Sequence, residues 1–233
     1  MHNPTATGAA VFHLGPLPVT VTVITTWAIM LALWLAAWLT TRNLTQQPGP
    51  LQAAVEGIVG AIEGTIKAVS PQHAERILPF IATLWVYLVA ANLTGLIPGL
   101  HSPTRDLSAT FALAILVFLS VHWFGIRAQG WKSYFRHYIS PSPILLPFHV
   151  ISEITRTVAL AVRLFGNMMS LEMAALLILL VAGFLAPIPI LMLHIVEALV
   201  QAYIFGMLAL IYVAGGLQSQ ELRQQTNEEQ LHE

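Results

Sequence analysis

The sequence predicts an all-α membrane protein with about five transmembrane helices and one amphipathic helix at the membrane surface. Only 9% of its 233 residues are charged, 56% are hydrophobic and the mean hydropathy is +0.72, whereas a soluble domain contains about 25% charged residues. Crossing a bilayer takes about 20 apolar residues, and runs of that length recur. We therefore interpret residues 1–233 as one membrane domain, with spans at 18–41, 76–98, 107–127, 143–183 and 187–218.

The first three of these runs have the length of ordinary transmembrane helices. The first run is long and no Lys or Arg precedes Arg42, so we expect a retained span rather than a cleavable signal peptide. Tryptophans in the three runs are expected either to anchor the helices at the membrane interface or simply to face lipid. They are Trp27, Trp34, Trp38, Trp85 and Trp123.

Residues 50–70 show a different pattern. Apolar side chains recur there at helical spacing, and Glu56, Glu63 and Lys67 fall together on the opposite side. A helix of this kind lies on the membrane surface rather than crossing it. Turn-forming prolines before and after the segment mark its ends.

The orientation follows from the basic residues of the loops. Seven lie on one predicted side of the membrane and only Arg105 on the other. Because basic residues gather on the cytoplasmic side, the N-terminus is predicted outside and the polar, flexible tail, residues 219–233, in the cytoplasm. The seven are Arg42, Lys67, Arg76, Arg127, Lys132, Arg136 and Arg223.

Composition and motifs exclude several classes of function. The net charge is −1 and no basic patch is present, which argues against a nucleic-acid partner. Cysteine is absent, so disulfides and thiolate metal sites are excluded, and we predict neither a metal nor a cofactor. No GxxxxGK[ST] loop occurs, so any ATP chemistry must take place on other subunits.

The last two apolar runs are too long to stand upright in a bilayer. At about 1.5 Å per residue, a continuous helix over 143–183 would be roughly 60 Å long and one over 187–218 nearly 50 Å, against a hydrocarbon core of about 30 Å. We predict two steeply tilted helices that form a hairpin at residues 186–189. The alternative is that residues 143–150 lie outside the membrane and the helix after them is ordinary.

Ionisable side chains lie within this hairpin, although each costs about 2.5–3.5 kcal/mol on insertion scales. On the first long helix, one polar stripe repeats every seven residues, with Asn167 one turn after Arg163 on the same side. Glu172 points roughly the opposite way. The stripe comprises His149, Arg156, Arg163 and Ser170.

The second long helix carries its own polar stripe, formed by His194, Glu197, Gln201 and Tyr212. If the hairpin closes, Glu172 and His194 lie at comparable distances from its tip, on the outer side. A carboxylate, an imidazole and an amide grouped there could relay protons or line a wet cavity.

Each of these residues also has a purely structural explanation. Glu153 and Arg156 are spaced for an intrahelical ion pair, and His194 taken alone would more often be a core histidine. We interpret His122 and Asn92, on the shorter spans, as structural. A functional rather than structural explanation is most strongly favoured for Arg163, because it cannot lose its proton and no acid lies within one turn of it.

The segment RLFGNM at residues 163–168, followed by Glu172, His194 and Gln201, resembles the membrane stator subunit of F-type ATP synthases, usually called subunit a. The segments NLTGLIPG at 92–99 and SPTRD at 102–106 extend the likeness over most of the chain. The combination at these spacings is highly specific, whereas RLFGN alone would be only suggestive.

The resemblance implies a subunit that packs two tilted helices against a rotating ring of c subunits, each with one carboxylate in the membrane. It also implies peripheral-stalk b subunits as partners, an indirect connection to the F1 sector, and a bacterial plasma (inner) membrane. In it Arg163 is the essential arginine facing the ring and Asn167 its polar neighbour, while Glu172, His194 and Gln201 belong to an outer half-channel. We expect the ion to be the proton, although sodium specificity depends on the ring.

This chain departs from the family at several positions. His149 stands where many members have Glu, Thr157 where Pro is common and Ala159 where Ser is common. Glu197 is an additional acid. His149, Glu153, Glu197 and Tyr212 are therefore candidates for accessory roles.

Two other functions compete with this one. A self-contained channel or secondary transporter would conduct ions alone, but no internal repeat of the kind that builds many transporters is visible. A non-conducting scaffold that anchors a peripheral stalk would keep transport intact after Arg163→Ala.

Overall fold

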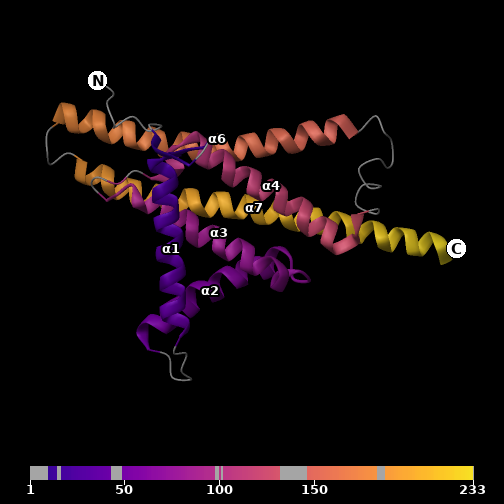
Figure 1. The fold of residues 1–233 in the computed structure, drawn as a ribbon. Helices are drawn as coiled ribbons and strands as arrows, with labels where there is room; N and C mark the ends of the chain where they lie inside the picture. Colours follow the sequence, from indigo (N-terminus) through magenta and orange to yellow (C-terminus); the bar gives the residue numbers. More distant parts are fainter. Residues whose placement is uncertain are drawn as a thin grey trace.

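The computed structural model describes residues 10–14, 17–42, 49–97, 100, 102–131, 146–182 and 187–232. Most of these residues are helical, and the predicted all-α membrane class is confirmed (Figure 1). The elements are β1 (Ala10–Leu14), β2 (Leu17–Thr20), α1 (Val21–Thr41), α2 (Pro50–Val69), α3 (Ala74–Thr94), the 3-10 helix η1 (Pro103–Arg105), α4 (Leu107–Gln129), α6 (Leu146–Ala182) and α7 (Pro187–His232).

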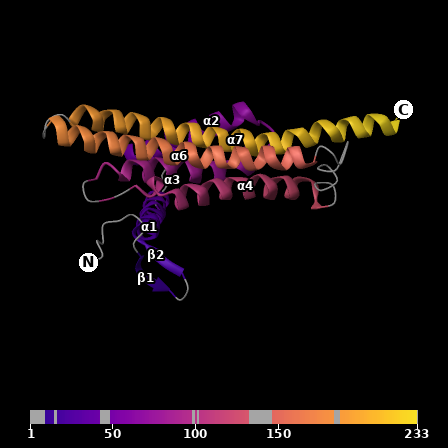
Figure 2. The ribbon, with the colours of Figure 1, turned by 90° about the horizontal axis from the view of Figure 1, so that it is seen from above.

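The two longest helices, α6 and α7, lie side by side and run in opposite directions (Figures 1 and 2). Helix α6 is continuous over 37 residues, about 55 Å at the usual rise, which exceeds the thickness of a hydrocarbon core. The alternative, in which residues 143–150 lie outside the membrane, stays a prediction. Helix α1 runs steeply across the direction of both. A bilayer normal along α1 would therefore leave α6 and α7 strongly inclined.

Four helical segments within the described residues are long and apolar enough to cross a membrane. Helix α6, which carries four charged residues, is not among them, so its crossing stays a prediction. The four are Val21–Thr41, Ala74–Thr94, Leu107–Arg127 and Leu191–Leu217.

Helix α7 lies at the centre of the packed region and contacts α2, α3, α4 and α6. Its inward side is built largely from small and medium residues, which let neighbouring helices approach closely. The buried residues on this side are Ala198, Ala202, Phe205, Ala209, Leu210, Val213, Ala214 and Leu217.

Helices α3 and α7 approach each other tightly at Gly206 of α7. A Cβ added to this glycine would lie 1.9 Å from Nε1 of Trp85 on α3. Trp85 is 7% exposed and stacks on Tyr203, with ring centroids 5.9 Å apart. Trp85 is thus a packing residue between α3 and α7, and the expectation that it faces lipid is wrong. The other tryptophans of the first three spans are exposed.

Two features differ from the sequence prediction. The strands β1 and β2 pair antiparallel just before α1, where no strand was predicted. The tail was predicted to be flexible from residue 219, but α7 continues to His232. That stretch is rich in Glu, Gln and Leu, which are good helix formers and extend an existing helix at little cost.

Candidate functional site

Side chains on or beside the two polar stripes meet at two places where α6 and α7 pack. Asn167 Nδ2 donates a hydrogen bond of 2.6 Å to Gln201 Oε1. Three turns away, the Arg156 guanidinium lies 4.7 Å from the centre of the Tyr212 ring. The two contacts are eleven residues apart on both helices, so they fix one antiparallel register over about 16 Å.

In this register Glu172 of α6 lies at the level of residue 196 of α7, between His194 and Glu197. The expected grouping of an acid and an imidazole along the hairpin is thus compatible with the backbone. The side chains of Glu172 and His149 lie outside the described part of the structure, and their predicted roles stay predictions.

Arg163 lies on the exposed side of α6. Among the described residues it has neither a hydrogen bond nor an ion pair. The exposed surface of α6 also includes large apolar side chains, among them Val158, Val162 and Met169, each at least 39% exposed. A permanent cation in such a place is costly unless an acid from another molecule reaches it.

His194 is only 6% exposed, and its Nε2 has no hydrogen-bond partner among the described residues. A Cβ added to Gly95 would lie 3.9 Å from this nitrogen and 3.3 Å from Cβ of Ser102. The imidazole thus points toward the place where the end of α3 meets η1. Gln201, which is 1% exposed, likewise has an Nε2 without a partner among the described residues.

A buried polar network stands beside His194. Asn92 Nδ2 donates to Ala198 O over 3.1 Å, and Asn92 Oδ1 accepts from Thr104 Oγ1 over 2.8 Å. Ser102 Oγ donates to Ala91 O over 2.8 Å and lies 2.6 Å from Thr104 Oγ1. The network ties α3, η1 and α7 together, which agrees with a structural role for Asn92.

The expected intrahelical pair between Glu153 and Arg156 is not formed. Glu153 Oε2 instead lies 3.4 Å from Nε2 of His122 on α4, and Arg156 turns toward Tyr212 on α7. The physical reason is that α4 and α7 both pack against this stretch of α6, so each side chain finds a partner on a neighbouring helix.

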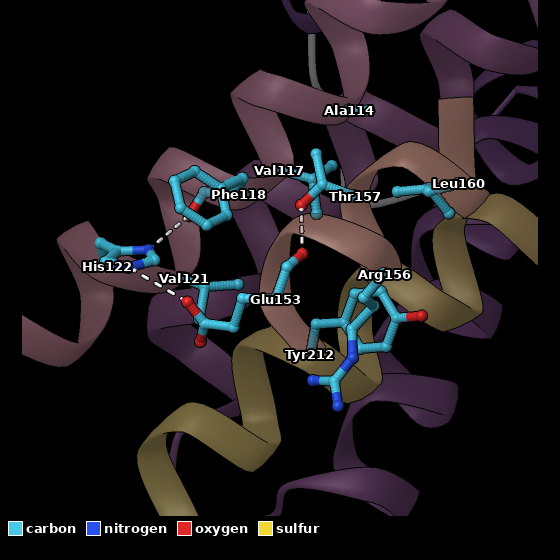
Figure 3. Close-up of a pocket in the computed structure, with 10 residues that line it drawn as sticks. All are labelled: Ala114, Val117, Phe118, Val121, His122, Glu153, Arg156, Thr157, Leu160 and Tyr212. Atoms are coloured by element: carbon cyan, nitrogen blue, oxygen red, sulfur yellow. Dashed lines mark hydrogen bonds and ion pairs between the residues drawn. The ribbon is translucent and has the colours of Figure 1, made fainter. Parts of the chain in front are cut away.

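These groups border a small cavity between α4, α6 and α7 (Figure 3). Its volume of about 30 Å³ is enough for about two water molecules. The residues that line it are Ala114, Val117, Phe118, Val121, His122, Glu153, Arg156, Thr157, Leu160 and Tyr212.

Sequence reasoning missed two parts of this arrangement. It gave His122 only a structural role, although a histidine and a glutamate on separate apolar helices signal a cross-helix pair. It also used the segment SPTRD only as a motif, although its Ser102 and Thr104 are buried hydrogen-bonding residues. The helix on which a distant partner lies cannot be read from one helix alone.

Among the described residues, Arg163 lies on the exposed side of α6 with no acid beside it, and His194 is buried with a ring nitrogen that has no partner. Both features suit an ion-translocating protein of the helical membrane class. The comparisons with known proteins agree. Residues 21–214 match the family described as ATP synthase A chain. The chain belongs to this family and is the ion-translocating stator subunit of the membrane sector of an F-type ATP synthase.

Several bacterial proteins named ATP synthase subunit a are similar along nearly their whole length. The chain is 66% identical to subunit a 2 of Pelobacter propionicus over 224 residues, which are 96% of this chain and 98% of that protein. It is 60% identical to subunit a of Legionella pneumophila over 215 residues, 92% and 94% of the two chains. It is 67% identical to subunit a 1 of Hahella chejuensis over 206 residues, 88% of each.

Proposed function

We propose that Arg163 is the cation that faces a ring of c subunits and couples ion flow to the rotation of that ring. The observation that carries this proposal is the placement of Arg163 on an exposed apolar face with no acid beside it among the described residues. The missing counter-charge would then be supplied by a membrane-embedded carboxylate of each passing c subunit.

The mechanism follows from simple electrostatics. A fixed positive charge lowers the pKa of a carboxylic acid that approaches it, because it stabilises the ionised form. Each ring carboxyl therefore gives up its ion as it reaches Arg163. The same charge repels protons and sodium ions, and so prevents a direct leak between the two access paths.

The two access paths are assigned to the two ends of the hairpin. Glu172, His194 and Gln201 would form the outer half-channel, and Asn167, which donates to Gln201, would hold that amide beside the Arg163 face. The unsatisfied Nε2 atoms of His194 and Gln201 suit a path that holds water or a passing proton. His149, Glu197, Glu153 and Tyr212 are accessory candidates.

The proposal includes the surroundings of the subunit. The loop charges place the N-terminus outside and the C-terminus in the cytoplasm, within a bacterial plasma membrane. The partners are the c ring, the peripheral-stalk b subunits, lipid and, indirectly, the F1 sector. The chain itself is non-catalytic, and the transported ion is the proton.

The test is ATP-driven ion pumping by the assembled complex in vesicles. Arg163→Ala is expected to abolish pumping while assembly stays intact, and Arg163→Lys to restore at most a small part, since lysine offers the charge without the planar fork. Arg127→Ala, at the exposed end of α4, is the matched control. Repeating the assay without sodium identifies the ion, and pumping that survives Arg163→Ala would leave only the scaffold function.

A further inference from the structure

The cavity between α4, α6 and α7 is bordered by His122, to which the mechanism above gives no role, and by Glu153, which it names only as an accessory candidate. His122 and Glu153 each keep about a quarter of their side-chain surface exposed, with 26% for both. The two residues are thus partly sheltered by the protein and partly exposed, and they lie side by side at the cavity (Figure 3).

The geometry fixes how many protons this pair holds. His122 Nδ1 lies 2.9 Å from the carbonyl oxygen of Phe118. A carbonyl oxygen only accepts hydrogen bonds, so Nδ1 must carry a proton. The other ring nitrogen, Nε2, lies 3.4 Å from Glu153 Oε2.

Without a further proton, this second contact would join two acceptors. A neutral imidazole with its proton on Nδ1 has only a lone pair at Nε2, and an ionised carboxylate has no proton to donate. The contact becomes favourable when one additional proton lies between the two atoms. It resides either on Nε2, which gives an imidazolium beside a carboxylate, or on Oε2, which gives a carboxylic acid beside a neutral imidazole.

The surroundings allow that proton to be exchanged. The cavity has room for about two water molecules, and the other ionisable groups that line it are Arg156 and Tyr212. Arg156 is held over the Tyr212 ring, which keeps its charge next to the cavity. The positive charge of Arg156 opposes a permanent second cation and so favours release of the shared proton.

The position of the pair relates it to the ion path. Glu153 is ten residues before Arg163 on α6, about 15 Å along the helix, and Arg156 lies on the same polar stripe as Arg163. The residues of the predicted outer half-channel lie beyond Arg163 in the other direction. The cavity therefore lies at the cytoplasmic end of the hairpin, in the predicted orientation.

We propose that His122 and Glu153 form a proton-binding site on the cytoplasmic branch of the ion path, and this inference rests on the proposed function. A hydronium ion in the cavity passes one proton to the pair: one O–H bond of the hydronium breaks, one N–H or O–H bond forms on the pair, and a water molecule remains. The reverse step breaks that bond and returns the proton to water. During ATP-driven pumping the site supplies protons toward the Arg163 face.

The alternative is that the pair only clamps α4 to α6, and the test must separate the two. ATP-driven proton pumping is measured in vesicles across a range of pH for wild type, Glu153→Gln and the double variant His122→Gln/Glu153→Gln. The double variant keeps a hydrogen-bonded amide pair but has no proton to titrate. Glu56→Gln, a surface acid on α2, is the matched control, and Arg163→Ala tests the proposed function separately.

The expected result is that both variants assemble into the complex. The plot of their pumping rate against pH should lack the same titration step that wild type shows. Without the bound proton, pumping follows free hydronium and falls roughly tenfold per pH unit at alkaline pH, because general acid–base transfer is lost. Wild type and Glu56→Gln stay nearly level over that range. The double variant shows no further loss beyond Glu153→Gln.

Two results would overturn the inference. A wild-type pH profile in both variants would show that the pair holds no transported proton. Failure of both variants to assemble would assign the pair to the α4–α6 contact. If Arg163→Ala still pumps, the proposed function fails instead, whatever the Gln variants show.

Discussion

The inner side of α7 and the outer side of α6 are both apolar, but only the first is covered by the chain itself. Leu210 and Phe205 of α7 are fully buried against neighbouring helices, whereas Ile154 and Val162 of α6 are 53% and 50% exposed. Arg163 lies on the exposed side. The difference shows that hydropathy alone does not distinguish a surface that the fold completes from one left for lipid or a partner.

The same substitution at two glycines should show the largest contrast. Gly206→Leu is expected to prevent stable packing of α3 on α7, because the new Cβ would meet the Trp85 ring. Overpacking of this kind costs typically about 1–3 kcal/mol and sometimes more. The measurement is the amount of folded subunit in the membrane, and Trp85→Leu in the same chain should recover part of it.

Gly166→Leu is the counterpart on α6, where an added Cβ meets nothing within 4 Å among the described residues. We expect the subunit to accumulate normally but the complex to pump several-fold less, since the larger side chain would obstruct a ring packed beside Arg163. The yield of the assembled complex measures accumulation of the subunit, and ATP-driven pumping in vesicles measures activity. Equal loss of subunit for Gly166→Leu and Gly206→Leu would remove the distinction between the two surfaces.

An intermediate effect is expected inside the α3–α7 contact. Asn92→Ala removes the donor to Ala198 O and the acceptor of Thr104, and a buried group left without a partner costs about 1–3 kcal/mol. Thermal unfolding of the complex should show the loss. Thr83→Ala, which removes an exposed hydroxyl bonded within its own helix, should change little.

The smallest effect on stability is expected from a substitution of Asp106, which lies where α1 meets the start of α4. Burial raises the pKa of Asp106, but hydrogen bonds from Ser108 and Thr22 and the nearby charge of Arg105 outweigh it, so the pKa lies below its usual value. An Asp in the unfolded chain has a pKa of about 3.9. Because the pKa of Asp106 is lower in the folded protein, its ionised form stabilises the fold at any pH above about 3.9, and this stabilisation is lost as the pH falls through the pKa of the folded state.

Asp106→Asn tests this pH dependence, because Asn keeps a helix-capping side chain but has no charge to lose. Wild type should be the more stable protein near neutral pH, and the gap should close on acidification. The measurement is the unfolding temperature of both proteins from neutral to acidic pH. If the difference in unfolding temperature between the two proteins stays constant with pH, the ionisation of Asp106 does not contribute to stability.

Helix type and extent were largely predictable, because a run of apolar residues must form its backbone hydrogen bonds internally in lipid. Helix α4 was predicted from residue 107, where it begins, and the α2 segment was placed within one residue of its ends. The end of α7 was not predictable, since a polar segment can either fray or continue an existing helix.

The candidate site was predictable in part. The heptad spacing put Arg156 and Arg163 on one stripe and His194 and Gln201 on another, and the contacts of Asn167 and Tyr212 show that these stripes meet. The partner of Glu153 was assigned to its own helix because local spacing is all that a single helix offers. Its true partner, His122, lies on another element.

By itself the sequence determined that this chain is a helical membrane protein with charges that hydrocarbon tolerates poorly, because composition and run length decide both. The tertiary structure alone decided which of these charges found partners. Glu153 pairs with His122 because α4 packs beside it, whereas Arg163 faces outward on α6. A side chain's partner depends on which helices meet and in what register, and those are properties of the packed fold.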